Sequence, residues 1–147
     1  MEIAVVGKDM RTLCSSVGVN ARTFSALSAV VGGHWDLLAL APEALASLPE
    51  KEVRATTLLL PGDSGSELAR ELCAVQLVGY GFSPRDTLTF SGVTGEERLL
   101  CLQRAMLTLR GTLLEPQELP LPGSFSSLSA ERALLAAGLR LLTDARL

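Results

Sequence analysis

Three short apolar runs, each ended by glycine or proline, most constrain what this chain can fold into. They are rich in Val, Leu and Ala and span residues 2–7, 35–42 and 53–62. Runs of this length and composition are typical of buried strands. Helical segments are predicted between them, and strands that alternate with helices indicate a parallel sheet. We therefore predict an α/β fold, a Rossmann-like domain in three layers with a mostly parallel sheet.

Helices are expected in the segments that connect these strands. At residues 20–31 apolar side chains recur at near-helical spacing, and two glycines follow, as at a helix C-terminus. One or two helical turns are expected at 42–49, between prolines. A further helix is predicted at 63–74, where Asp63 or Ser64 is placed to act as the N-cap.

The second half of the chain differs, because strands follow one another without helices between them. The predicted strands are 75–81, 87–93, 98–107 and 112–121. Turn segments rich in Gly, Pro, Asp and Glu separate them, which indicates antiparallel hairpins. A C-terminal helix is predicted at 126–142, with Ser127 or Ser129 as its N-cap and one apolar stripe of Leu128, Leu135, Leu139 and Leu142. No repeat or linker divides the sequence, so residues 1–147 are predicted to form one domain.

Composition and charge exclude several classes of protein. The chain has 147 residues, of which 48% are hydrophobic and 20% charged, as in a globular domain. Its net charge of -3 provides no basic surface for nucleic-acid phosphates. No apolar stretch approaches the roughly 20 residues of a membrane helix. We expect a cytoplasmic protein with neither nucleic acid nor a membrane as partner, and the mean hydropathy of +0.33 leaves a homo-oligomer open.

Few residues match known catalytic or metal-binding patterns. His34 is the chain's one histidine and stands at a strand entrance, where a packed or solvated side chain is the common case. The three cysteines, Cys14, Cys73 and Cys101, lack a C-x-x-C pair and are expected to be reduced, packed thiols. The segments after Gly7 and at 18–24 follow the outline of a phosphate-binding loop without matching it. Either could be a plain turn or a weak anion site, and no metal or cofactor is expected.

One group of polar residues is a candidate binding surface. Gln103 and Arg104 lie on one predicted strand, and Gln117 and Glu118 lie on the next. We expect the two strands to be neighbours, so these four side chains could form one surface that binds a ligand. The alternative is structural: Arg104 would pair with Glu118 or Glu115 and tie the two strands together.

The stretch "VGYGFSPRDTLTFSG" adds Tyr80 as a candidate, either to cover the sheet end or to stack on a ligand. In order and spacing, residues 56–142 resemble the second half of the central domain of Mur ligases, ATP-dependent enzymes that add amino acids to peptidoglycan precursors. In that resemblance Asp63 is the remnant acid, Tyr80–Phe82 is the family's aromatic turn, and Gly123 precedes the final helix. The segment "CLQRAMLTLRGTLLEPQELPL" is also similar to small uncharacterised Mur-ligase-related proteins of clostridia-like bacteria.

The resemblance implies a Mur-ligase-type domain without the ligase chemistry. Phe125, Ser126 and Ser129 stand where the family places His and Asn near the nucleotide, and the phosphate loop is missing or degraded. Phosphoryl transfer depends on that loop, its lysine and magnesium. We therefore expect a non-catalytic binding or regulatory module whose partner is a protein or a small cell-wall-related ligand. The alternatives are an enzyme or enzyme subunit with a degenerate ATP site in cell-wall precursor metabolism, and an oligomeric structural protein.

Overall fold

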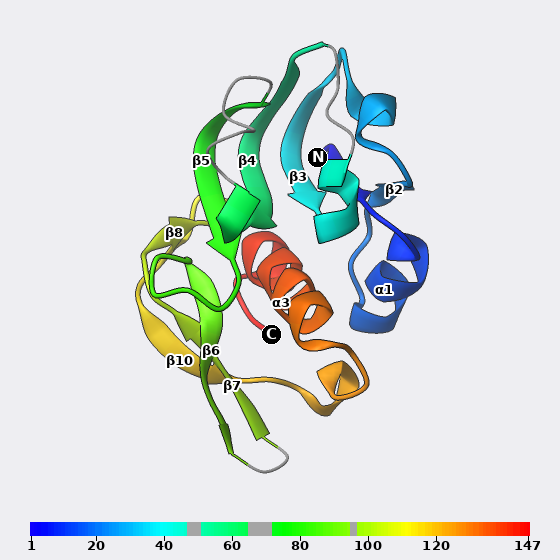
Figure 1. Cartoon of the computed structure of the whole chain (residues 1–147). Helices are drawn as coiled ribbons and strands as arrows, with labels where there is room; N and C mark the ends of the chain where they lie inside the picture. The colour runs from blue at the N-terminus through cyan, green and yellow to red at the C-terminus, as the bar shows by residue number, and fades with distance from the viewer. Residues whose placement is uncertain (47–50, 65–71, 95–96) are drawn as a thin grey trace.

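The computed structural model describes residues 1–46, 51–64, 72–94 and 97–147. Within them the chain forms a mixed sheet in the order β10-β7-β6-β5-β4-β3-β1-β2 (Figure 1). Neighbouring strands run parallel from β2 to β6, and β7 and β10 are antiparallel additions at one edge. The strands are β1 (Ile3–Val6), β2 (Arg22–Phe24), β3 (His34–Leu40), β4 (Val53–Pro61), β5 (Leu72–Tyr80), β6 (Leu88–Thr94), β7 (Glu97–Leu102) and β10 (Gln117–Pro120). This is the α/β fold predicted from the alternating runs.

A short separate hairpin lies against the sheet. It pairs β8 (Met106–Leu107) with β9 (Leu113–Leu114). The Gln76 side-chain amide of β5 holds it in place, because its Oε1 accepts from the Leu107 N–H at 2.8 Å and its Nε2 donates to the Leu107 carbonyl at 2.9 Å. The hairpin is thus attached to β5 by a side chain that reproduces the pairing of a backbone strand.

Two α-helices cover one face of the sheet. They are α1 (Met10–Val17) and α3 (Ala130–Asp144), and both contribute to a core with the inward side chains of β1, β3, β4, β5 and β6. Arg140 of α3 joins the helices, because its Nη1 donates to the Val17 carbonyl at 2.7 Å and satisfies the C-terminal end of α1. Figure 1 shows α3 running across the sheet with α1 beside it.

The other face is covered, in the part of the chain that the structure describes, by short 3₁₀ segments. These are η1 (Leu27–Val30) and η2 (Pro42–Ala46), while η3 (Gly62–Ser64) follows β4 and η4 (Gly123–Phe125) precedes α3. Leu27, Val30 and Ala44 pack there with Leu38, Leu40, Leu58 and Leu60 in a second core cluster. No helix among the described residues is both long and apolar enough to span a membrane.

The helix predicted at 20–31 is wrong. Arg22–Phe24 forms β2, which pairs in parallel with β1, and only one 3₁₀ turn follows it. Tertiary contacts explain the strand: the Phe24 ring meets Trp35 edge-on at 5.8 Å between centroids, and the Arg22 guanidinium covers both rings. The helix of this region is instead α1, whose buried residues Met10, Leu13, Cys14 and Val17 recur at helical spacing.

The hairpin predicted between residues 75–81 and 87–93 is wrong, because β5 and β6 run parallel. The strands predicted at 98–107 and 112–121 are each divided in two, into β7 and β8 and into β9 and β10.

Other predicted elements agree with the structure where it describes them. The runs at 2–7, 35–42 and 53–62 are β1, β3 and β4, and the C-terminal helix begins after Ser129, whose hydroxyl accepts from Arg132 N. The turns predicted at 42–49 begin as η2. Most of the helix predicted at 63–74 lies outside the described residues, and its last positions belong to β5.

Candidate functional site

The carboxyl ends of the parallel strands meet at one edge of the sheet. β1 and β3 are neighbours in the sheet. The chain continues from β1 to β2 on one side of this pair and from β3 to β4 on the other side. Ligands of open α/β sheets bind preferentially at such an edge, outside the strand ends. In Figure 1, η2, η3 and the N-terminal end of α3 lie around the ends of β3, β4 and β5.

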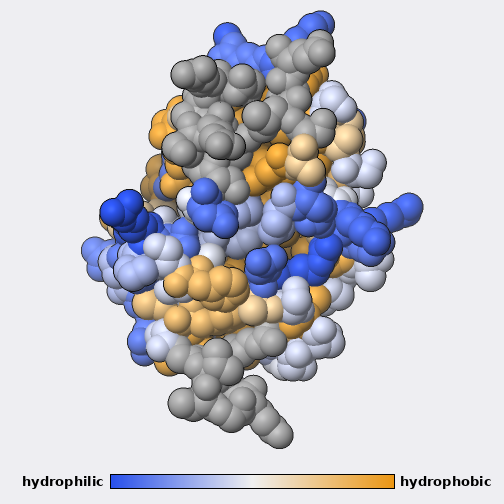
Figure 2. Space-filling view, viewed as in Figure 1, coloured by the Kyte–Doolittle hydropathy of each residue, from blue (hydrophilic) through white to orange (hydrophobic). Residues whose placement is uncertain are grey.

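A cavity of about 950 Å³ opens at this edge. Its volume lies in the range of small-molecule pockets, which is roughly 300–1,000 Å³. The floor is apolar and comes from β4 and β5, through Leu58, Leu60, Leu72, Ala74 and Leu77. The rim adds Phe82 and the charged residues Asp63, Arg85, Asp86, Arg104 and Glu131. On the face shown in Figure 2, hydrophilic side chains gather in a band across the middle, with hydrophobic surface beside and below it.

Two large apolar side chains of the cavity are exposed to solvent. Leu77 is 62% exposed and Phe82 is also 62% exposed. Isolated apolar residues on a surface are ordinary, but apolar side chains gathered in a concave site mark a place where a partner can remove them from water. The cavity therefore offers apolar area that folding alone does not bury.

The rim between β5 and β6 is a tightly held loop at residues 81–87. Gly81 N donates to the Leu88 carbonyl at 3.0 Å at its start, and the Gln103 N–H donates to the Thr87 carbonyl at 2.8 Å at its end. The Gln103 side-chain Nε2 also donates to the carbonyl oxygens of Ser83 and Asp86, at 3.2 and 2.6 Å. These bonds fix the shape of the rim, so the cavity is largely preformed.

Asp86 is the buried acid of this loop, with 5% of its surface exposed. The Ser83 N–H donates to its Oδ2 at 3.0 Å. Its carboxylate lies against three glycines, Gly62, Gly79 and Gly81, where any β-carbon would contact the carboxylate oxygens. Glycine at these strand ends thus makes room for a charged group at the cavity wall.

Tyr80 closes the end of β5 from inside the core. It is 1% exposed, and its hydroxyl donates to the Leu40 carbonyl of β3 at 2.7 Å. Burial raises the pKa of Tyr80 well above its usual range, and the negative charges of Glu131 and Glu43 add to this shift. This geometry fits the covering role considered for Tyr80, because the ring is almost fully buried.

The loop after β1 carries no open anion site. The Lys8 N–H donates to Glu43 Oε1 at 3.1 Å, and Arg132 Nη2 binds the same oxygen at 2.9 Å. Partial burial raises the pKa of Glu43, but hydrogen bonds from its own and the Lys8 backbone N–H and the Arg132 charge outweigh this, so the pKa is lowered. The Lys8 backbone N–H lies in the loop that was considered as an anion site. It donates instead to the carboxylate of Glu43.

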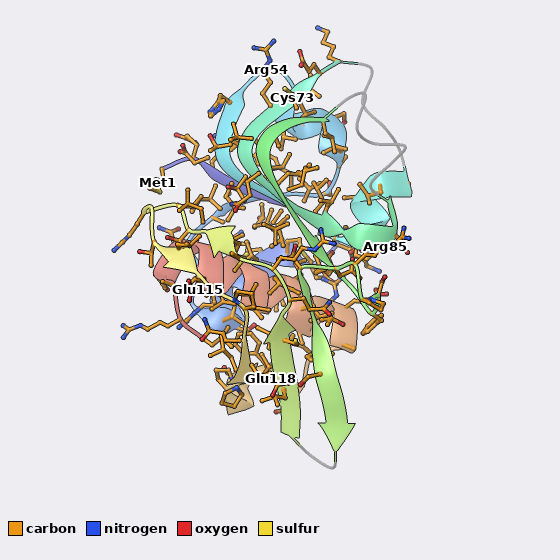
Figure 3. The ribbon with its side chains drawn as sticks, turned by 90° about the vertical axis from the view of Figure 1, so that its left-hand side faces the viewer. Met1, Arg54, Cys73, Arg85, Glu115 and Glu118 are labelled. Carbon is orange, nitrogen blue, oxygen red and sulfur yellow. The ribbon has the colours of Figure 1, made fainter. Side chains whose placement is uncertain are left out.

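Of the five residues singled out from the sequence, two line the cavity and three do not. Tyr80 and Arg104 line the cavity, while Gln103 lies behind its loop. Gln117 and Glu118 belong to β10, which pairs with β7 as predicted, but neither lines the cavity. The Gln117 amide bonds the carbonyl of Glu115, and Figure 3 shows Glu115 on the opposite side of the molecule from Arg85.

The alternative structural role of Arg104 is wrong. In the described part of the chain, no ion pair joins Arg104 to a glutamate of the neighbouring strand. The buried Asp86 and the exposed Leu77 were not predicted as site residues. In the sequence, Asp86 is an acid between two strands, and glycines stand near the strand ends. The same pattern is typical of an exposed turn residue, so it does not identify a buried site acid.

The cysteines and the histidine do not form a site. Cys14 is buried, which raises the pKa of its thiol, and Cys101 is half-buried, as expected of packed thiols. Cys73 is exposed, so the prediction of a packed thiol is wrong there, because β5 turns this side chain to solvent. His34 is exposed, with Nε2 3.4 Å from Thr56 Oγ1. Among the described residues, no three His, Cys, Asp or Glu side chains are grouped to hold a metal ion.

No protein-family model, curated protein or solved structure matches this chain.

Proposed function

We propose that this chain is a non-catalytic binding module that takes up a small molecule in the cavity at the carboxyl ends of β4 and β5. The observation that carries the proposal is the cavity itself, about 950 Å³ with an apolar floor and charged residues at its rim. Its preformed loop supports it further, because a rigid site loses little conformational entropy on binding.

The apolar floor sets what the ligand must contain. Leu77 and Phe82 are the exposed apolar side chains of the cavity, and only an apolar group can remove them from water, with each Å² so buried contributing about 25 cal/mol. The rim then orients the molecule through hydrogen bonds and charge. A ligand with an apolar body and one polar head satisfies both parts of the cavity.

The proposal includes descent from the central domain of a Mur ligase, with a Rossmann-like layering of the sheet. The order of elements supports this: β4 ends beside Asp63, β5 ends at Tyr80, and an alanine-rich helix closes the chain. The Glu43 carboxylate on the Lys8 N–H supports a module that does not hold a phosphate after β1. This descent suggests that the ligand is a cytoplasmic molecule related to the cell wall.

The test is binding of the neutral apolar dye Nile red to matched variants of one strand. Leu77 lines the cavity and Val75 does not, although both are exposed on β5. We expect the unmodified chain to bind the dye with a fluorescence increase. Leu77→Ser should weaken binding by about fivefold or more, as expected for loss of part of a leucine contact, and Val75→Ser should leave it unchanged. Equal losses in both variants would contradict binding in the cavity.

Self-association is a second candidate, because apolar side chains outside the cavity are also exposed. Val75 is 89% exposed, and Leu107 and Leu113 of the β8–β9 hairpin are 48% and 59% exposed. Gln76 holds the hairpin beside β5, so these residues lie on neighbouring segments. Light scattering tests this candidate: a dimer that Leu113→Ser dissociates supports it, and a monomer at all concentrations contradicts it.

A further inference from the structure

Among the described residues that line the cavity, Asp86 is the charged group that solvent screens least. Asp63, Arg85, Arg104 and Glu131 also line the cavity but are exposed, whereas Asp86 is 5% exposed. Charges on exposed side chains interact weakly because water and salt screen them. A charge held in a less polar environment interacts more strongly with an opposite charge. The recognition of a polar head group therefore depends mainly on Asp86.

The carboxylate of Asp86 has capacity to accept further hydrogen bonds. An ionised carboxylate has about four lone-pair sites. The Ser83 N–H is the donor that the described residues provide to its side chain, at Oδ2. The other oxygen, Oδ1, faces the α-carbons of Gly62 and Gly79, which supply no N–H or O–H group there. A carboxylate in this setting favours a ligand that brings its own donor and a positive charge.

The three glycines show that the position of this carboxylate is built into the strand ends. A β-carbon on Gly81 would lie 2.6 Å from Asp86 Oδ2, and one on Gly62 would overlap Oδ1. Gly79 would bring a third β-carbon to 3.4 Å from Oδ1. Any larger residue at Gly62 or Gly81 would push the acid from the cavity wall, so the site depends on a particular combination of an acid and glycines.

We infer that the cavity recognises an organic ammonium group attached to an apolar body, with the ammonium on Asp86 and the apolar body on the exposed Leu77 and Phe82. This inference rests on the proposed function, because it names the class of ligand for the same cavity. Asp63 and Glu131 at the rim favour the same charge. Arg85 and Arg104 oppose it, but both lie exposed in water at the mouth.

Three probes of one length test the inference on the unmodified chain, by competition with Nile red at pH 7 and 0.15 M salt. They are 1-hexylamine, 1-hexanol and hexanoate, which share an apolar body and differ in the head group. We expect hexylamine to compete about tenfold more strongly than hexanol, since hydrogen bonds between charged partners are the strong ones. Hexanoate should compete less well than hexanol.

Two matched Asp→Asn variants then locate the recognition. Asp86→Asn keeps the shape and the acceptor for Ser83 but removes the charge, so hexylamine and hexanol should compete within about twofold of each other once the charge is gone. Asp144→Asn changes an exposed acid of α3 that does not line the cavity, and should retain the preference for the amine. Circular dichroism confirms that each variant is folded.

The outcomes separate this inference from the proposed function. If Nile red binds but hexanoate competes best, or all three probes compete equally, the ammonium inference is overturned and the cavity remains a binding site. An unchanged amine preference in folded Asp86→Asn also overturns it. If Asp86→Asn does not fold, the ranking of the probes on the unmodified chain decides. If Nile red does not bind at all, the proposed function itself fails.

Discussion

The Asp86 carboxylate occupies the position that a β-carbon on Gly62 would take. The two residues belong to different loops, one after β4 and the other between β5 and β6, so their contact sets the spacing of these loops at the cavity. Two sequence positions that are far apart in the chain are therefore coupled. Glycine at position 62 permits a buried acid at position 86.

Gly62→Ala is predicted to destabilise the protein by about 1–3 kcal/mol, because the added methyl group must displace a buried carboxylate. Gly123→Ala is the matched control, since a β-carbon there has no neighbour within 4 Å. The control should change the free energy of unfolding by less than about 0.5 kcal/mol. Urea unfolding of the three proteins measures both, and equal stability of all three would show that Asp86 moves aside freely.

Gly138→Ala in α3 should lower stability by about 1 kcal/mol, although alanine is the better helix former by a similar amount. The reason is crowding: a β-carbon there would lie 2.9 Å from Leu59 Cδ2 and 3.0 Å from Leu88 Cδ1. Combining it with Leu59→Ala should cost less than the sum of the single changes, because the smaller residue makes room. Additive costs in thermal unfolding would exclude this contact as the cause.

Glu43 is predicted to make stability fall at acid pH. Its pKa is lower in the folded state, so its contribution is present above the unfolded value of about 4.3 and is lost as pH falls through the folded value. Glu43→Gln should therefore reduce stability at pH 7, by less than about 1 kcal/mol because the pair is partly exposed. The difference should shrink as the pH falls below the unfolded value of about 4.3. Glu118→Gln, which changes an exposed acid of β10 that forms no ion pair with the described residues, is the control and should change the free energy of unfolding at pH 7 by less than about 0.5 kcal/mol.

Tyr80 is the chain's one tyrosine, so its ionisation can be followed by ultraviolet absorbance. Its folded pKa is raised, mainly by burial, so the native state keeps the proton after the unfolded chain would lose it near pH 10. The stability that this group contributes is complete below pH 10 and declines above it. Tyrosinate absorbance should appear together with the loss of circular dichroism. Ionisation near pH 10 in a folded protein would contradict the buried hydroxyl bond to Leu40.

The sheet could be predicted from the sequence because its strands carry their own signals. The runs that became β1, β3 and β4 are short, apolar and ended by Gly or Pro, and each of these properties is local. The segment at 22–24 could not be assigned in this way. Its strand depends on pairing with β1 and on Phe24 packing against Trp35, and such tertiary contacts override local spacing.

The candidate site was predicted less completely than the sheet, for a related reason. Tyr80 and Arg104 line the cavity. Both lie near strand ends, and the order of elements in the sequence can indicate such positions. Asp86 becomes a site residue only because Gly62 and Gly81 lie against it in the folded chain. No local sequence pattern indicates that these three positions come together. Gln117 and Glu118 were proposed from strand pairing, which the structure confirms, but pairing does not specify which edge of the sheet is hollow.

The most direct test of the central claim, that the cavity binds a small molecule with an apolar body, is amide chemical-shift mapping with 1-hexanol by nuclear magnetic resonance. The account predicts that the largest shifts fall on the amides of Leu77, Gly79 and Ser83, which line the cavity. Shifts that cluster on Gln117 and Glu118 of β10, or no shifts at saturating probe, would contradict it.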